Sequence, residues 1–496
     1  MGPDCRPKPH DLRLYRVERA GDDAVKDRQE VVAGMQHVTG TGGRTYFLLA
    51  VIVATGLAVF TGPAVSTPGP AGTTAAAPAL RTDGPRWGPA RSVSPPHRRA
   101  TSPALAYDGI GNTAAVWRAW DGRNWRVQYS QQRRKSDWSR PVWISAPGTD
   151  VADPQVRIYS GGGANKAGRY VRPYATRVVS WLAQRRHHAV VMASVTYGAS
   201  SWSRPLTVSD PRRDAVKPIP WYAAAQWREG RSREPTPTVF YLGDDGHHRR
   251  VQMATLDHAG TTVHRQFLSA AGGDARDLSM AGWKEQRLMF SRFDGHHYVA
   301  LSHLFLTLPT SGPEAYGDIA ENMLTPMFSR FGVYWTNRSG GDVRLRGSFH
   351  GGQPTTVSNV GGDVLGIYST VMDRRSRHDI VWRERGAGVA TLFHAYRGRD
   401  GWAAPQPVSA PGLRTGTPAV ARCSWTTVLA WPQQIPEHPL RWRVRSADLS
   451  DLGPVIHSAM PPRLVMGASG RQQNALALAW RDPTSHRIVV AKVLHR

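Results

Sequence analysis

Five aspartates recur in short polar segments and are the side chains best suited to acid–base or metal chemistry: Asp153, Asp214, Asp277, Asp318 and Asp363. Carboxylates that converge on one point can hold a hard cation. Two of them can instead serve as the acid and the base of a glycoside hydrolase, where their separation sets the stereochemical outcome. Short acids also cap turns by accepting bonds from nearby backbone N–H groups, and such caps recur in repetitive chains. We favour the capping role and keep the five aspartates as the catalytic candidates if the protein is an enzyme.

Adjacent histidines form the second group, in three pairs: His187 and His188, His247 and His248, and His296 and His297. Imidazoles on one rim could bind a ligand or a transition metal, or respond to protonation. Neighbouring residues of a strand point to opposite faces of the sheet, however, and separate turns at an outer rim lie too far apart to share an ion. We therefore expect exposed turn residues. They are our candidate ligand-binding residues, and we predict neither a metal site nor a cofactor.

The segments that must position these groups repeat along the chain. A stretch with Trp and Pro near its start begins at Trp87, Trp138, Trp202 and Trp402, and an apolar run closes on an aromatic residue in eight places: Trp117, Trp181, Tyr241, Phe290, Trp335, Trp382, Trp431 and Trp480. Each apolar run has a short apolar segment before it, and after it a turn and a further strand. With the Trp-containing segment this makes four strands, A to D in chain order. Repeated four-stranded units of this kind are typical of β-propeller blades.

In such a blade the D–A and B–C connections share one face. The acids lie on the D–A loops, which are closest to the axis, and the histidines lie in the B–C turns. The closing aromatics are predicted to form the core between blades rather than a platform for sugars.

The two ends of the repeat region set the number of blades. The chain ends at Arg496 just after a C strand, whereas the segment at Trp87 is a D strand with no repeat before it. If the first segment completes the last sheet, the count is eight and no sheet edge is left free. We predict an all-β fold, a single propeller of eight four-stranded antiparallel blades. Seven blades is the alternative, because the repeats of Phe290 and Trp335 have degenerate D strands. Polar insertions at 160–172 and 228–236 are expected to be surface loops.

The chain before Trp87 is divided by composition. Residues 1–43 form a polar leader that we expect to be disordered, and Met35 offers a later start. Residues 44–64 contain an apolar run shorter than the about 20 residues of a membrane-spanning helix, which predicts a signal peptide, with an uncleaved anchor as the alternative. Residues 65–86 are a linker rich in Pro and Ala. The propeller at 87–496 is then expected to be secreted or held at the cell surface, with contact to membrane only through the apolar run.

The Trp-containing strands and the Trp-ended B strands resemble the sialidase-like (BNR-type) propeller repeats of secreted bacterial proteins, over residues 87–496. The Asp-box of sialidases, Ser-x-Asp-x-Gly-x-Thr-Trp, is absent, and the stretch around Asp108 has the wrong spacing. No arginine triplet or Tyr–Glu pair of that family can be assigned. The resemblance therefore implies the fold and no particular activity.

The net charge of +26 predicts attraction to anionic partners. The arginines are scattered and form no dense tract, which disfavours nucleic acid. Our leading interpretation is an exported, non-catalytic propeller, expected to be a monomer, that binds an anionic glycan or cell-wall polymer. A glycoside hydrolase or lyase that uses the loop acids is one alternative. A scaffold for protein assembly, through the insertions near Tyr170 and Trp227, is the other.

Overall fold

The computed structural model describes residues 87–492, apart from 109–110, 134–135, 165–169, 186, 199–200, 224–235, 258–260, 262, 282–286, 305–313, 316–322, 330–331, 340, 350–352, 360, 373–377, 387, 399–400, 411, 424–425, 447–455, 459 and 469–475. The leader, apolar segment and linker predicted at 1–86 lie outside these residues, as does the insertion predicted at 228–236 except for its last residue. Within the described part, no helix has the length and apolar character needed to cross a membrane.

The described strands form eight sheets, and consecutive strands pair antiparallel within each. The first four blades are blade 1, β2 (Ala100–Tyr107), β3 (Thr113–Trp120), β4 (Trp125–Gln132) and β5 (Val142–Trp143); blade 2, β6 (Val151–Ala164), β7 (Tyr170–Arg185), β8 (His188–Tyr197) and β9 (Leu206–Thr207); blade 3, β10 (Ala215–Ala223), β11 (Thr236–Asp244), β12 (Arg249–Leu256) and β13 (Val263–Phe267); and blade 4, β14 (Ala275–Ala281), β15 (Arg287–Phe293), β16 (Tyr298–Leu304) and β17 (Glu314–Ala315).

The other four are blade 5, β18 (Leu324–Ser329), β19 (Gly332–Ser339), β20 (Asp342–Phe349) and β21 (Thr355–Thr356); blade 6, β22 (Asp363–Met372), β23 (His378–Gly386), β24 (Val389–Gly398), β25 (Gly401–Trp402) and β26 (Gln406–Pro407); blade 7, β27 (Ala419–Cys423), β28 (Thr426–Ile435), β29 (His438–Ser446) and β30 (Ile456–His457); and blade 8, β31 (Leu464–Ala468), β32 (Leu476–Asp482), β33 (Arg487–Lys492) and β1 (Arg91–Ser92). In blade 6 two short strands, β25 and β26, both pair with β24 where one D strand was expected.

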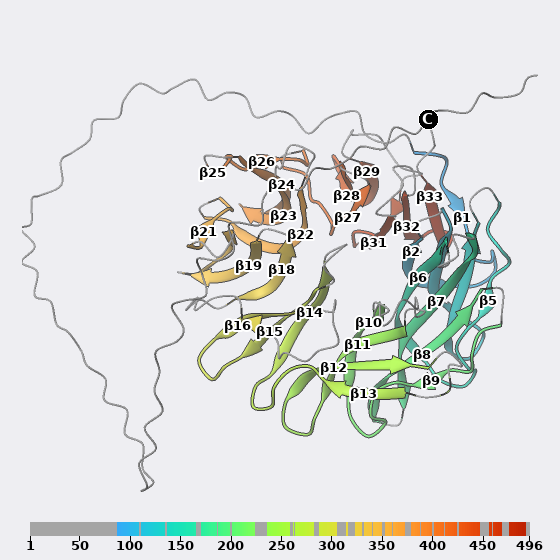
Figure 1. Ribbon diagram of the computed structural model, residues 1–496. Coiled ribbons are helices and arrows are strands. Elements are labelled where there is room, and N and C mark those ends of the chain that lie inside the picture. Colours follow the sequence, from blue (N-terminus) through green and yellow to red (C-terminus); the bar gives the residue numbers. More distant parts are fainter. Residues whose placement is uncertain are drawn as a thin grey trace, which may run out of the picture. The chain divides into compact units, whose positions relative to one another are not determined.

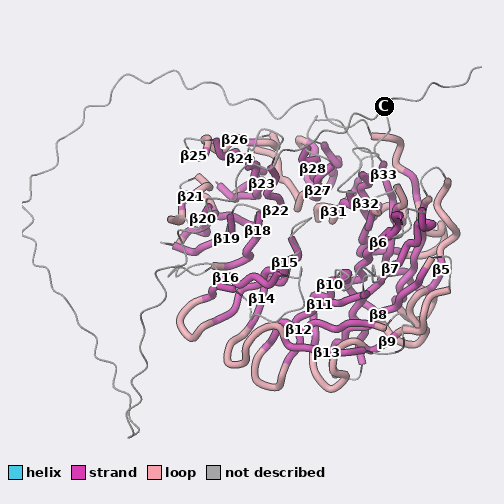
Figure 2. Tube along the Cα trace, viewed as in Figure 1, coloured by secondary structure: helices cyan, strands magenta, loops and turns pink. Residues whose placement is uncertain are grey.

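The eight-bladed propeller is confirmed, and the alternative of seven blades is wrong. Blades 4 and 5, whose D strands looked degenerate, have D strands of two residues, β17 and β21. The A strands stand around the centre and the D strands at the outside (Figure 1). Loops join the strand ends, and strands make up nearly all the rest (Figure 2).

Strand β1 closes the ring by completing blade 8. Arg91 is paired with Val490 and Ser92 with Val489. Beyond the ladder, the Val93 N–H donates to the Ile488 carbonyl over 2.9 Å and the Gly88 N–H to the Lys492 carbonyl over 2.7 Å. The closure predicted from the two ends of the repeat region is therefore present.

The core consists of apolar clusters between successive blades, one at each of the eight junctions. Because side chains alternate across a strand, each B strand supplies both of its neighbours. In β3, Val116 packs against blade 2 whereas Trp117 packs against blade 8. Burial on both faces explains why the B strands are almost continuously apolar. The eight closing aromatics are all within 1% of complete burial, as predicted for core residues.

A buried serine after the D strand explains the repeated ending in which Val, Ile or Leu precedes Ser. Its hydroxyl oxygen accepts the backbone N–H of a C-strand residue over 2.9–3.1 Å. The described serines in this role are Ser94, Ser145, Ser209, Ser269, Ser358 and Ser409. Each bond is worth about 1 kcal/mol and fixes a short outer strand that has few ladder bonds of its own.

The insertion at 160–172, expected to be a surface loop, is instead largely strand. It lengthens the β6–β7 hairpin, with Ser160 paired with Ala175 and Ala164 with Tyr170. The Gly-rich sequence suggested a loop because glycine has low strand propensity. The ladder of the long hairpin overrides that preference.

Lys492, at the end of β33, gives the closing junction a dependence on pH. Its Nζ lies 5.7 Å from the ring centres of both Tyr107 and Trp138 of blade 1. Burial lowers the pKa of Lys492 to about 8. The unfolded chain keeps this proton up to about pH 10.4. Between those pH values the unfolded state binds more protons than the folded state, so this group adds stability as the pH rises.

We therefore expect Lys492→Met to raise the free energy of unfolding at pH 7, because the variant buries no charge. The gain over the wild-type protein should shrink as the pH rises from about 8 towards 10. Urea unfolding at several pH values measures the difference. A gain that is the same at pH 7 and pH 10 would contradict the buried charge as its cause.

Candidate functional site

Four acids at the start of an A strand or directly before it bind the preceding blade. A carboxylate oxygen of each accepts a backbone N–H from the start of that blade's C strand, over 2.7–3.0 Å. The pairs are Asp150 with Trp125, Asp214 with Ala189, Asp274 with Arg249, and Asp363 with Val343. Two catalytic candidates, Asp214 and Asp363, thus lie at junctions where they join blades. Capping of backbone N–H groups by these acids occurs across blades rather than within one turn.

Two further candidates, Asp153 and Asp277, lie at a bulge that recurs in the A strands. The first bulge residue has a left-handed backbone in five successive blades, with φ between 46° and 55°: Ser102, Asp153, Lys217, Asp277 and Thr325. The ladder register shifts at each of these bulges. Non-glycine residues held in this conformation carry strain of about 1–3 kcal/mol. The fifth candidate, Asp318, lies outside the described residues.

The carboxylate of Asp277 links three blades. The Asp277 side chain is only 12% exposed. Its oxygens lie 3.9 Å from Nζ of Lys217 in blade 3 and 3.0 Å from Nε of the adjacent Arg276. The Thr325 N–H of blade 5 donates to it over 3.2 Å. Asp153 accepts a bond from the Gln155 side chain over 3.0 Å. The oxygens of Asp277 are therefore committed to structural contacts, as is one oxygen of Asp153.

In each histidine pair the second residue stands beside an acid, and the first is exposed. Nδ1 of His188 is 3.7 Å from Asp214, Nδ1 of His248 is 3.7 Å from Asp274, and Nδ1 of His297 is 3.5 Å from Asp294. His187, His247 and His296 are the exposed members. Each second histidine thus has an acid of its own, and no two pairs share one.

Two of these turns are capped by an aspartate. Asp294 accepts the N–H groups of His296 and His297, each over 2.9 Å, and Asp245 does the same for His247 and His248. The backbone N–H of His297 and then that of His296 lower the pKa of Asp294. Nowhere in the described part do three or more His, Cys, Asp or Glu side chains gather as metal ligands would.

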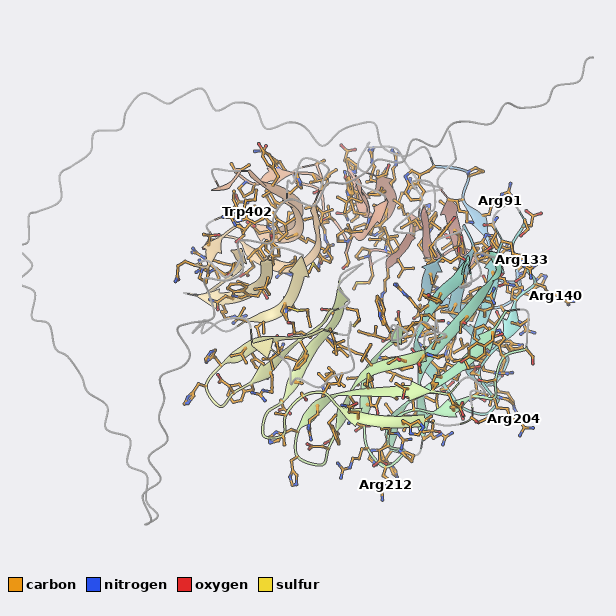
Figure 3. The ribbon with its side chains drawn as sticks, in the orientation of Figure 1. Arg91, Arg133, Arg140, Arg204, Arg212 and Trp402 are labelled. Carbon is orange, nitrogen blue, oxygen red and sulfur yellow. The ribbon has the colours of Figure 1, made fainter. Side chains whose placement is uncertain are left out.

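Exposed arginines follow the outer edge of the propeller over blades 8, 1 and 2. We call Arg91, Arg133, Arg140 and Arg204 the arginine edge (Figure 3). Arg91 is 3.5 Å from the exposed carboxylate of Asp137. Within the described part, the other three arginines form no ion pair. Trp143, also on this edge, has two guanidinium groups over its ring, with the Cζ of Arg98 5.0 Å and that of Arg126 4.5 Å from the ring centre.

A cavity of about 210 Å³ lies where blades 7, 8 and 1 meet, and we call it the closure cavity. Its lining comes from the A strand of blade 1, the D–A loop that leads into blade 8, and the end of the B strand of blade 8 with the turn after it: Thr101, Ser102, Pro103, Ser458, Met460, Pro461, Pro462, Arg463, Arg481 and Pro483. It lies on the face of the D–A and B–C loops. None of its described lining residues is acidic, and two are arginines.

Sequence reasoning missed this cavity. Its residues come from three segments, of which 101–103 is far from the other two in the chain, and Arg463 belongs to no repeated pattern. Arg481 follows the closing Trp480 as Arg118 follows Trp117 and Arg383 follows Trp382, so its position in the repeat marks no site. The prolines at 461, 462 and 483 are the only available signal, and they indicate turns rather than a site.

Comparison with known proteins concerns the fold. No family model matches the chain, and no curated protein matches it in sequence. Among solved structures it is similar to an ulvan lyase, a polysaccharide lyase (10% identity, TM-score 0.41, covering 82% of this chain and 95% of that one). It is also similar to an α-L-arabinofuranosidase from Fusarium graminearum (8%, 0.33, 82% and 98%) and to the Aleuria aurantia lectin (11%, 0.29, 63% and 97%). Similarity at this level carries no argument about this chain. By its own sheets, the chain is an eight-bladed β-propeller.

Proposed function

We propose that this protein is a non-catalytic propeller that binds an anionic polysaccharide outside the cell. The arginine edge carries the proposal. Arg133, Arg140 and Arg204 are exposed along one side without ion-pair partners among the described residues, so their charges are available to a polyanion. Export rests on the apolar run at 46–60 and on the resemblance to secreted sialidase-like repeats. The engagement of Asp214, Asp277 and Asp363 in blade junctions favours binding over hydrolysis.

Binding to polygalacturonate, with neutral dextran as the comparison, tests this function. The full chain should bind the acidic polymer, and affinity should fall steeply with salt, because exposed charges are screened over about 8 Å at physiological ionic strength. The triple variant Arg133→Gln, Arg140→Gln, Arg204→Gln should bind the polymer about tenfold more weakly. Each lost ion pair with the polymer should reduce the binding free energy by about 0.2–1 kcal/mol.

A matched control removes three exposed arginines from blades 5, 6 and 7: Arg338, Arg385 and Arg441. Both triple variants have the same net charge. Equal loss in the two variants would show that total charge, and not the arginine edge, attracts the polymer. Release of new reducing ends or unsaturated ends would instead support the hydrolase or lyase alternative.

A further inference from the structure

Arg481 has incomplete hydrogen bonding at the closure cavity. One of its terminal nitrogens, Nη2, lies 2.6 Å from Nδ1 of His486. Its Nε is buried without a partner among the described residues, as is the Nε of five other arginines: Arg118, Arg126, Arg292, Arg344 and Arg383. Of these six, Arg481 is the one that lines the closure cavity. A buried N–H with no acceptor is costly, and native structures rarely leave one unpaired. An acceptor that enters the cavity would remove this cost.

His486 holds the guanidinium in place from a strained position. Guanidinium nitrogens only donate, so Nδ1 of His486 is the acceptor. His486 itself has a left-handed backbone, with φ of 54°. The residue just before the C strand is left-handed in four blades, and in two of them it is glycine: Gly341, Gly388, Glu437 and His486. Glycine would take this conformation without strain. At His486, therefore, the backbone strain accompanies the bond to Arg481.

The remaining walls define the shape and polarity of a ligand. Arg463 adds a second cation, and Ser102 and Thr101 contribute hydroxyl groups. Prolines and the exposed Met460 supply flat apolar surface, against which the C–H faces of a sugar ring can pack. The volume of the closure cavity is smaller than that of sites for drug-sized ligands, which is about 300–1,000 Å³. A compact ring that carries one negative group fits these limits.

We propose that the closure cavity binds the carboxylate of one uronic acid unit, with Arg481 and Arg463 as the ligand-binding cations and His486 as a positioning residue. The Nε–H and a terminal N–H of a guanidinium form a planar fork that matches the two oxygens of a carboxylate. The inference rests on the proposed function only in taking the acidic sugar as a unit of the bound polymer. It adds a site that recognises the unit itself, apart from the arginine edge.

Calorimetry of the full chain with glucuronate, glucose 6-sulfate and glucose tests the site. Glucuronate should bind and glucose should not, and Arg481→Gln should weaken glucuronate at least about tenfold, as expected for the loss of a bidentate charge-assisted contact. Arg338→Gln, at an exposed position in blade 5, is the matched control and should leave glucuronate affinity unchanged. Tighter binding of the sulfate would overturn the assignment to a carboxylate.

The two proposals fail separately. If polygalacturonate binds through the arginine edge but glucuronate does not bind, or binds equally to Arg481→Gln, the cavity proposal is wrong and the function stands. If glucuronate binds through Arg481 but the polymer does not bind, the function is wrong. Thermal unfolding of Arg481→Gln checks that the closing junction remains folded, and Arg463→Gln offers a second variant if it does not.

The role of His486 is tested by replacing it with glycine. His486→Gly should relieve backbone strain and leave thermal stability equal or higher, yet weaken glucuronate several-fold, because Arg481 loses the acceptor that orients it. Glu437→Gly makes the same backbone change in blade 7 and should not alter glucuronate affinity. A purely structural histidine would change stability and leave affinity intact, which would overturn the positioning role.

Discussion

Deletion of residues 87–94 will cost the protein about 5 kcal/mol of folding free energy, from four or five hydrogen bonds of about 1 kcal/mol each and a buried valine. The deletion removes β1, the contacts of Gly88 and Val93 with β33, and the bond from the Ile488 N–H to Ser94. Because single domains are stable by only about 5–15 kcal/mol, this loss is at least about a third of the stability. The exposed edge of β33 should also promote association of chains.

Urea unfolding and sedimentation velocity measure the two effects. Deletion of residues 75–82 is the control of equal length, since it leaves β1 and its partners intact. If the two deletion variants are equally stable and both monomeric, closure of the ring by β1 does not contribute to folding.

Trp117→Ala should destabilise the propeller by about 3–5 kcal/mol, the usual cost of truncating a buried tryptophan. Trp117 is completely buried in the cluster between blades 8 and 1. Its Nε1–H donates to Oε1 of Gln128 over 3.0 Å, and Gln128 is only 3% exposed. The substitution therefore leaves a cavity and a buried amide that has lost its donor, and the second effect adds to the first.

Trp120, three residues further along β3, provides the comparison. It is partly exposed and packs edge-to-face on Trp125, with ring centres 5.6 Å apart. Trp120→Ala should cost about 1 kcal/mol, the worth of such an aromatic pair. Chemical denaturation of both variants, with Trp117→Phe as an intermediate, measures the difference. Comparable losses for Trp117→Ala and Trp120→Ala would contradict the view of Trp117 as a core residue.

Repetition made the fold predictable. Trp117, Trp181 and their counterparts each end an apolar strand, and the segment at Trp87 lacks a repeat before it, so blade number and closure both follow from pattern. The length of the β6–β7 hairpin did not follow, because its Gly-rich residues are held by ladder bonds rather than by local preference. Local sequence also did not show that blade 6 has two short outer strands.

The site was less predictable. Residues that recur in each repeat show which loop they belong to, but not which side chains lie close together in space. Asp214 and Asp277 looked alike in the sequence, yet Asp214 accepts an N–H from the preceding blade, whereas Asp277 lies at a strained bulge among cations and accepts an N–H from the following blade. Their assignment as catalytic residues stays a prediction, as does that of the paired histidines as ligand-binding residues. Arg463 and Arg481 stand next to the paired Leu464 and Trp480 in the A–B hairpin of blade 8, and only the wall from blade 1 depends on ring closure.

The bond from Gly88 to Lys492 brings two points from opposite ends of the described chain within 2.7 Å. A short peptide linker could bridge that gap, and new termini could then be opened in a loop between any two other blades. Such a circular permutant would keep every blade and every junction, while the noncovalent closure would move from the β1–β33 pair of blade 8 to the junction that was opened. Comparing permutants would thus measure how much cooperativity the propeller owes to the place where its chain happens to begin.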